Sequence, residues 1–224
     1  MEKRPILISL TGPSCSGKTT ILNSLQLMGI TPIVSSTTRQ PRVGEINGKD
    51  YFFISDLERQ RVQAANGFVE LVEFSGNWYG VTKSEMRNKL VDGSVCAIVL
   101  DPMGVKEYEN ICSDIGALIY KVYVDTDVNL RVARMQERFL KDLKSLAPHD
   151  TPDKLVSAYT SRLSSTLCKE RLWYSTNNWE MNAFGDLNPN DQASTILRRA
   201  LEKQRRDVEV RDFIFSKPHL HIGK

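Results

Sequence analysis

Short apolar runs alternate with segments of helical periodicity along most of this chain. Apolar and β-branched runs predict strands at residues 5–10, 31–36, 95–100 and 118–124. Amphipathic patterns predict helices near residues 18–28, 104–112, 127–144, 152–173 and 190–205. The runs at 95–100 and 118–124 are mostly apolar, which is typical of strands buried on both faces. The pattern therefore predicts an α/β fold with a parallel central sheet covered by helices.

Residues 36–90 interrupt this alternation. A turn-rich stretch at 41–48 precedes an aromatic run at 51–54, a helical pattern at 56–65 and a strand pattern at 68–74. We interpret residues 35–90 as a small inserted subdomain. The expected organisation is one domain over residues 1–205, with a core of 1–34 and 91–205, followed by a charged C-terminal tail at 206–224 outside the core.

The composition agrees with one compact enzyme-sized domain. The 224 residues are 41% hydrophobic and 25% charged, enough for a substantial core. The 30 basic and 27 acidic residues give a net charge of +3, too balanced to predict a nucleic-acid-binding surface. The apolar run near the start is too short for a signal peptide or a membrane span. Cys15, Cys96, Cys112 and Cys168 lack the spacing of metal ligands and predict reduced thiols, so we expect a cytoplasmic protein.

Residues 12–19 match the pattern G-x-x-x-x-G-K-[ST] between the first predicted strand and the first predicted helix. In such a loop, glycines let successive backbone N–H groups approach one phosphate chain, and the helix N-terminus adds positive charge. Lys18 is expected to reach the outer phosphates, and the Thr19 hydroxyl to hold Mg²⁺. The predicted ATP-binding residues are Gly12, Pro13, Ser14, Cys15, Ser16, Gly17, Lys18, Thr19 and Thr20.

The predicted insert carries three further motifs. Residues 36–53 follow S-T-T-R-x-P-R-x-G-E-x-x-G-x-x-Y-x-F, residues 68–70 follow F-x-E, and residues 76–80 follow G-N-x-Y-G. Together with the glycine loop, these motifs resemble the guanylate kinase family in order and spacing, over roughly residues 5–175. The resemblance implies a P-loop kinase fold with a monophosphate-binding insert and a lid. It also implies that Arg39, Arg42, Tyr51 and Tyr79 hold the phosphate of the acceptor nucleotide.

The resemblance also implies which residues contact the base. Glu70 matches a carboxylate that accepts from the ring N–H and the amine of guanine, where adenine would present a lone pair. Glu73 fits a half-exposed strand residue, and only the F-x-E register favours Glu70. Ser35 matches a second base contact, and Asp101 matches a carboxylate near the guanine and the active centre.

Two positions depart from the family pattern. Val81 stands where the family usually has a Ser or Thr that donates to the guanine 6-oxo group, which predicts looser base choice. Thr82 would compensate only if the turn shifts. Val99 stands where the family commonly has another aspartate, and Asp101 could hold magnesium through water instead.

The segment after residue 127 resembles the lid of the family, expected here at about residues 135–160. Arg134, Arg138 and Arg162 are predicted to close over the transferring phosphoryl group, because charge on its oxygens needs guanidinium donors. The alternative is an amphipathic helix with arginines on its solvated face, and Arg131 is predicted to be such a surface residue. Asn182 is the predicted match to an asparagine on the adenine side.

The sequence thus predicts a nucleoside monophosphate kinase that transfers the terminal phosphoryl group of ATP to GMP or dGMP, with Mg²⁺. Its predicted partners are small-molecule nucleotides, and we expect it to bind neither nucleic acid nor membrane. The sequence leaves open whether it is a monomer or a homodimer. Two alternatives stay open. One is a kinase of broader specificity for (deoxy)nucleoside monophosphates, and the other is a non-catalytic guanylate-kinase-like binding module.

Overall fold

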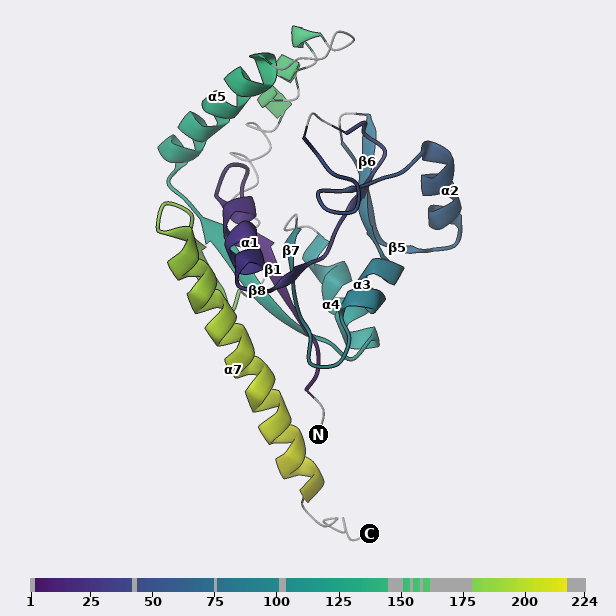
Figure 1. The fold of residues 1–224 in the computed structure, drawn as a ribbon, viewed down its shortest axis with the longest axis vertical. Helices are drawn as coiled ribbons and strands as arrows, with labels where there is room; N and C mark the ends of the chain where they lie inside the picture. Colours follow the sequence, from purple (N-terminus) through teal and green to yellow (C-terminus); the bar gives the residue numbers. More distant parts are fainter. Residues whose placement is uncertain are drawn as a thin grey trace.

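A computed structural model describes residues 3–41, 44–74, 76–100, 104–144, 151–153, 155–157, 159–161 and 179–216 (Figure 1). Its main sheet has five strands in the order β2-β7-β1-β8-β9, and every neighbouring pair is parallel. These strands are β1 (Ile6–Thr11), β2 (Thr31–Pro32), β7 (Val95–Leu100), β8 (Leu118–Asp125) and β9 (Met181–Phe184). The predicted fold class is confirmed.

The strands of this sheet carry apolar side chains on both faces, and helices cover both faces. Along β1, Ile6, Ile8 and Leu10 pack into one core cluster with residues of α1 (Lys18–Leu27) and α7 (Pro189–Ser216). Leu7 points the other way, into a second cluster with residues of α3 (Lys83–Lys89) and α4 (Val105–Asp114). All four β1 side chains are fully buried. The period of two along the strand therefore supplies two cores from one segment.

The insert forms a second sheet of four strands in the order β4-β3-β6-β5, flanked by α2 (Asp56–Ala64). Its strands are β3 (Ser36–Thr37), β4 (Phe52–Phe53), β5 (Phe68–Phe74) and β6 (Asn77–Thr82). The strand predicted over 31–36 is wrong as one element, because the chain leaves the central sheet after Pro32 and joins the insert sheet at Ser36. Neither β6 nor α3 was predicted.

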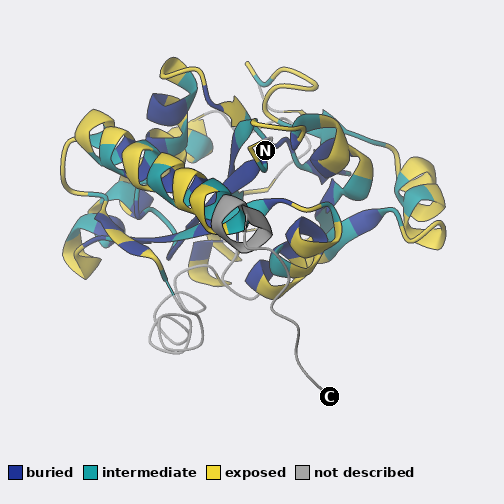
Figure 2. Ribbon diagram, turned by 90° about the horizontal axis from the view of Figure 1, so that it is seen from below, coloured by how far each residue is buried: buried dark blue, intermediate teal, exposed yellow. Residues whose placement is uncertain are grey.

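The last helix is longer than predicted. We expected a helix over 190–205, but α7 continues to Ser216, so the predicted helix end at 205 is wrong. Gln204 is 2% exposed and its Nε2 donates to the Arg4 carbonyl at 2.6 Å. Asp207 forms ion pairs with Arg4 at 3.1 Å and Arg211 at 2.9 Å. Figure 2 shows α7 with exposed residues along its outer side.

The helix α5 (Val128–Lys144) follows β8 and carries the first part of the predicted lid. In Figure 1, α5 and the insert lie on opposite sides of α1. The helix predicted over 152–173 lies mostly outside the described residues, although those described between 152 and 161 are helical. Tyr159 from this segment packs edge-on against Phe139 of α5 at 5.2 Å between ring centroids, and its hydroxyl donates to Asp142 at 2.7 Å. The two segments of the predicted lid therefore contact each other.

Two chemical expectations concern the whole chain. Cys15, Cys96 and Cys112 are free thiols, as predicted, and Cys168 lies outside the described residues. Burial raises the pKa of the Cys112 thiol to about 12, which keeps it protonated near neutral pH. Within the described part of the chain, no helix combines the length and apolar character needed to span a membrane.

Candidate nucleotide-binding site

The loop between β1 and α1 has a backbone that requires its glycines. Gly12 has φ +146°, and a Cβ at this position would lie 2.3 Å from the carbonyl oxygen of Val124. Gly17 has φ +98° and is the N-cap of α1. Cys15 also takes a left-handed φ of 61°. The segment therefore turns tightly enough to aim backbone N–H groups at one point before α1 begins.

Neighbouring connections hold this loop from outside. The Thr126 hydroxyl donates to the Ser16 carbonyl at 2.8 Å. Arg134 of α5 donates to the carbonyls of Cys15 at 3.3 Å and Gly185 at 2.9 Å. A Cβ on Gly185 would lie 1.7 Å from the Ser16 oxygen, so only glycine lets the chain after β9 approach the loop this closely. The loop is thus tied to the segments that follow β8 and β9.

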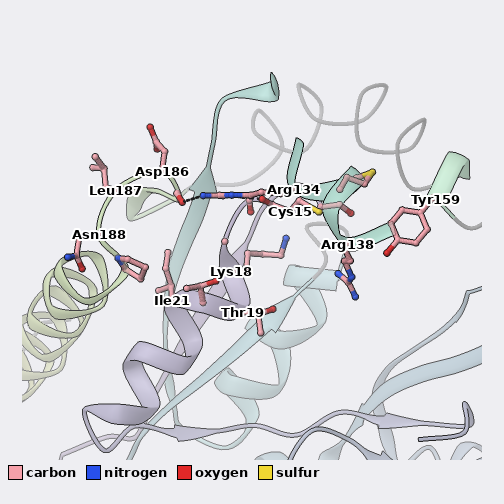
Figure 3. Close-up of a pocket in the computed structure, with 17 residues that line it drawn as sticks. Cys15, Lys18, Thr19, Ile21, Arg134, Arg138, Tyr159, Asp186, Leu187 and Asn188 are labelled. Atoms are coloured by element: carbon pink, nitrogen blue, oxygen red, sulfur yellow. Dashed lines mark hydrogen bonds between the residues drawn. The ribbon is translucent and has the colours of Figure 1, made fainter. Parts of the chain in front are cut away.

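A cavity of about 790 Å³ opens beside the loop (Figure 3). This volume lies within the range of pockets that hold small ligands. Among the described residues, three cationic side chains line it: Lys18 from α1, and Arg134 and Arg138 from α5. The predicted ATP-binding residues that line it are Ser14, Cys15, Ser16, Gly17, Lys18, Thr19 and Thr20. The other two, Gly12 and Pro13, accept hydrogen bonds from the Lys18 ammonium at 2.8 and 2.6 Å.

Another wall of the cavity comes from the connection between β9 and the first residue of α7, which the sequence reasoning missed. Its residues are Gly185, Asp186, Leu187, Asn188 and Pro189. Asn182, the predicted match on the adenine side, is exposed on β9 and is not among the residues that line this cavity, so its role stays a prediction. Asn188 lies there instead, and its Oδ1 accepts from the backbone of Asn190 at 2.9 Å. An asparagine followed by proline before a helical pattern is a helix-start signal that could have found this segment.

The arginine and tyrosines predicted to hold the acceptor phosphate gather in the insert. The Arg39 guanidinium lies 5.6 Å from the Tyr51 ring centroid, and the Tyr51 and Tyr79 rings are 6.1 Å apart. Both Glu45 carboxylate oxygens accept from Arg39, at 2.9 and 3.0 Å. Burial alone would lower the pKa of the Arg39 guanidinium, but the hydrogen bond and charge of Glu45, together with Tyr79, raise this pKa above its ordinary value. Arg42 lies outside the described residues.

Glu70 and Glu73, the two candidate base-reading carboxylates on β5, lie in different surroundings. Glu73 is exposed, whereas Glu70 is half-buried and its Oε1 accepts from the Tyr108 hydroxyl of α4 at 2.9 Å. Val81 is paired with Glu70 across the sheet and is 1% exposed, in the same core cluster as Tyr108.

Three further predicted positions surround this pair. The Thr82 hydroxyl caps α3 by accepting from Glu85 N at 3.1 Å. If Thr82 shifted to take the place of the Ser or Thr that the family has at position 81, this cap would be lost. Ser35 lies between β2 and β3, where its carbonyl accepts from Phe52 N at 2.9 Å. Asp101 lies outside the described residues.

The three arginines of α5 differ sharply in exposure. Arg134 and Arg138 line the cavity, and Arg138 is exposed. The prediction that Arg131 is a surface residue is wrong, because it is 4% exposed and its Nε donates to the Thr126 carbonyl at 3.0 Å. Arg131 therefore supports the connection that holds the glycine loop. Arg162 lies outside the described residues.

A parallel sheet whose first strand leads through a glycine loop into a helix, with a second small sheet inserted after β2, defines a P-loop kinase fold. The chain belongs to the guanylate kinase family, whose sequence model, described as Guanylate kinase, matches residues 2–145.

Individual relatives agree with this membership. A guanylate kinase of Sus scrofa is 36% identical over 149 residues, 64% of this chain and 72% of that protein. One from Wolbachia sp. subsp. Brugia malayi is 30% identical over 189 residues, 77% of this chain and 96% of that protein. The human guanylate kinase is 43% identical over 106 residues, and the match spans 53% of its length. The crystal structure of guanylate kinase from Anaplasma phagocytophilum has the same fold, with a TM-score of 0.58, 20% identity and coverage of 90% and 87% of the two chains.

Proposed function

We propose that the protein transfers the terminal phosphoryl group of ATP to GMP or dGMP, giving ADP and GDP or dGDP. The observation that carries this proposal is the cavity beside the glycine loop with Lys18, Arg134 and Arg138 on its walls. The Arg39, Tyr51 and Tyr79 cluster on the insert supplies a second anion-binding group of side chains. Two phosphate-binding groups in one chain of this family support a reaction between two nucleotides.

On the donor side, the loop N–H groups and the N-terminus of α1 would hold the triphosphate of ATP. Lys18 now donates to loop carbonyls, and its flexible stem allows the ammonium to turn to the outer phosphates. An oxygen of the GMP phosphate attacks the terminal phosphorus in line while the bond to the ADP oxygen breaks. Arg134 and Arg138, together with Arg162, would neutralise charge on the transferring group and exclude water as the lid closes.

The donor set fits magnesium. The Thr19 side chain is exposed at the start of α1 and lines the cavity. The described residues contain no cluster of three or more His, Cys, Asp or Glu side chains. Mg²⁺ needs no such cluster, since it keeps several waters and takes substrate phosphate oxygens as ligands. We therefore assign Thr19 as its protein ligand, and the bound ion would neutralise charge between the outer phosphates of ATP.

On the acceptor side, Arg39, Arg42, Tyr51 and Tyr79 would hold the GMP phosphate. A guanidinium fork and phenol donors suit a dianionic phosphate, and the carboxylate of Glu45 now occupies the fork of Arg39. The phosphate would displace this carboxylate from Arg39. Ser35, Glu70 and Asp101 would contact the base, and Val81 would lie beside it. The reaction concerns small-molecule nucleotides, and we place it in the cytoplasm.

A coupled assay of ADP release tests the proposal directly. The purified protein with Mg-ATP is offered GMP, dGMP, AMP, dAMP, CMP and dTMP side by side. We expect kcat/KM for GMP or dGMP to exceed that for the other four by about 100-fold, since the half-buried carboxylate of Glu70 pairs with the donors of guanine and not with the other bases. Similar rates across several bases would favour the broader kinase. Nucleotide binding without any diphosphate product would favour the binding module and contradict the proposal.

A further inference from the structure

The carboxylate of Glu70 reaches from the insert to the core. Glu70 belongs to β5, yet its Oε1 accepts a hydrogen bond at 2.9 Å from Tyr108, a residue 38 positions later on α4. Its other oxygen, Oε2, lies against the start of the same helix, where a Cβ on Gly104 would be only 2.1 Å away. Both oxygens of this carboxylate therefore lie on the first turn of α4, a position that the helix dipole favours for an anion.

The surroundings of Tyr108 keep its hydroxyl protonated as a hydrogen-bond donor. Its side chain is fully buried in the second core cluster, beside residues of the central sheet. Burial, followed by the charge of Glu70, raises its pKa well above the ordinary value of 10. The phenol consequently stays protonated at any pH where the protein works. Because core packing fixes the ring, the hydroxyl is held in one position, where it donates to Glu70.

We propose that Tyr108 is a positioning residue for base selection, which orients the carboxylate of Glu70 so that both of its oxygens face the guanine edge. This inference rests on the proposed function, because it assumes that Glu70 receives the base. Each carboxylate oxygen has two lone pairs, so Oε1 accepts from Tyr108 and still accepts from guanine. The plane of the carboxylate is thereby set before the nucleotide arrives. Gly104 leaves the space that this plane requires.

A comparison of guanine with hypoxanthine can distinguish a misoriented Glu70 carboxylate from a general defect in the protein core. Guanine presents a ring N–H and an exocyclic amine together, whereas hypoxanthine presents the ring N–H alone. A fixed carboxylate plane benefits GMP, which needs both oxygens, more than IMP, which needs one. A loosened carboxylate should therefore lower the preference for GMP over IMP. A core defect would weaken both monophosphates alike and would reach the ATP side as well.

The test uses Tyr108→Phe, which removes only the hydroxyl. We expect KM for GMP to rise about 10-fold, the loss typical of a hydrogen bond to a charged group, with kcat and KM for ATP within about twofold. The GMP over IMP ratio of kcat/KM should fall about fivefold. Tyr120→Phe is the matched control, since Tyr120 is 5% exposed in the core cluster on the opposite face of the sheet. That variant should leave the ratio unchanged.

Gly104→Ala provides an independent second variant. Gly104 has φ −85° and ψ −5°, a conformation that alanine adopts, so the fold should tolerate the change. Its methyl group would meet the flexible end of Glu70 and move the carboxylate. We expect the same selective loss for GMP with a melting temperature close to wild type.

Calorimetric binding of GMP and IMP to wild type and both variants completes the experiment, because it does not depend on turnover. An unchanged ratio in both variants, or an equal loss for GMP, IMP and ATP, would overturn the role of Tyr108. Failure of the proposed function would look different, as wild type itself would then form no GDP. If wild type binds GMP no better than IMP, Glu70 does not read the base and the inference falls with it.

Discussion

The donor and acceptor halves of the site differ in what holds them. The donor loop is one continuous segment whose shape comes from backbone geometry, with Gly12 and Gly17 at positive φ next to a fully buried strand. The acceptor half uses side chains from separate segments, on a sheet whose strands β3 and β4 are only two residues long. The difference teaches that one local motif suffices to build the proposed triphosphate site, whereas the proposed base site relies on long-range contacts such as that between Glu70 and Tyr108.

The largest effect is expected when Lys18, the cationic side chain of the glycine-loop motif, is removed from the donor half. Lys18→Ala should lower kcat/KM by about 1000-fold, because the charge on the transferring group loses a donor at close range. Stability should fall only slightly, since the half-buried Lys18 gives up two hydrogen bonds to loop carbonyls that water can replace. Steady-state kinetics and thermal melting measure both effects. Lys106→Ala, an exposed lysine on α4, is the control, and equal losses in the two variants would contradict the role of Lys18.

Two arginines on α5 sharpen the same comparison. Arg134 lines the cavity, and its removal should lower kcat by about 100-fold with a small change in melting temperature. Arg131 is buried against the Thr126 carbonyl, and its removal should lower the melting temperature by several degrees. Parallel measurement of kcat and melting temperature in both alanine variants tests this division. The reverse pattern would exchange the two roles.

The acceptor half is tested by Arg39→Ala. We expect KM for GMP to rise about 50-fold while KM for ATP stays within about twofold, because the guanidinium fork is lost from one side only. Arg61→Ala is a matched control, as Arg61 is exposed on α2 of the same insert. A rise in KM for ATP equal to that for GMP would show that the two halves are not separate.

The smallest expected effect concerns Val81, which is buried beside Glu70. Val81→Thr adds the hydroxyl that the family pattern has near the guanine oxygen, so KM for GMP should fall about threefold. The buried hydroxyl should also cost about 1 kcal/mol of unfolding free energy. Denaturant unfolding and the GMP over AMP preference measure the two effects. A lower preference for GMP would show that Val81 does not face the base.

Apolar runs and helical periodicity correctly predicted the strands and helices that short stretches of sequence determine. The apolar runs of β1, β7 and β8, and the helices α1, α4 and α5, fall within two residues of their predicted bounds. The strand β6 was missed because its asparagine and its glycine indicate a turn, and α3 because it has only seven residues. Around residue 205, α7 contacts Arg4 near the other end of the chain, a long-range contact that no local window of sequence contains.

The same limit applies to the site. The glycine loop was found because its motif is contiguous, and Arg39, Tyr51 and Tyr79 were found through the family resemblance. Arg131 was misjudged because helical periodicity does not reveal that α5 packs this residue under Thr126. Tyr108 falls on the apolar face of α4 and is indistinguishable by pattern from any core residue. Its hydrogen bond to Glu70 emerges only when the insert folds onto the core.

The central claim is that ATP binds beside the glycine loop and GMP binds on the insert of the same chain, with their phosphates in line. A bisubstrate inhibitor with adenosine and guanosine joined through a polyphosphate tests it most directly. We predict that one inhibitor binds per chain and competes with ATP and with GMP alike, and that Arg39→Ala weakens it. Competition with ATP alone, with GMP still able to bind beside the inhibitor, would contradict the account.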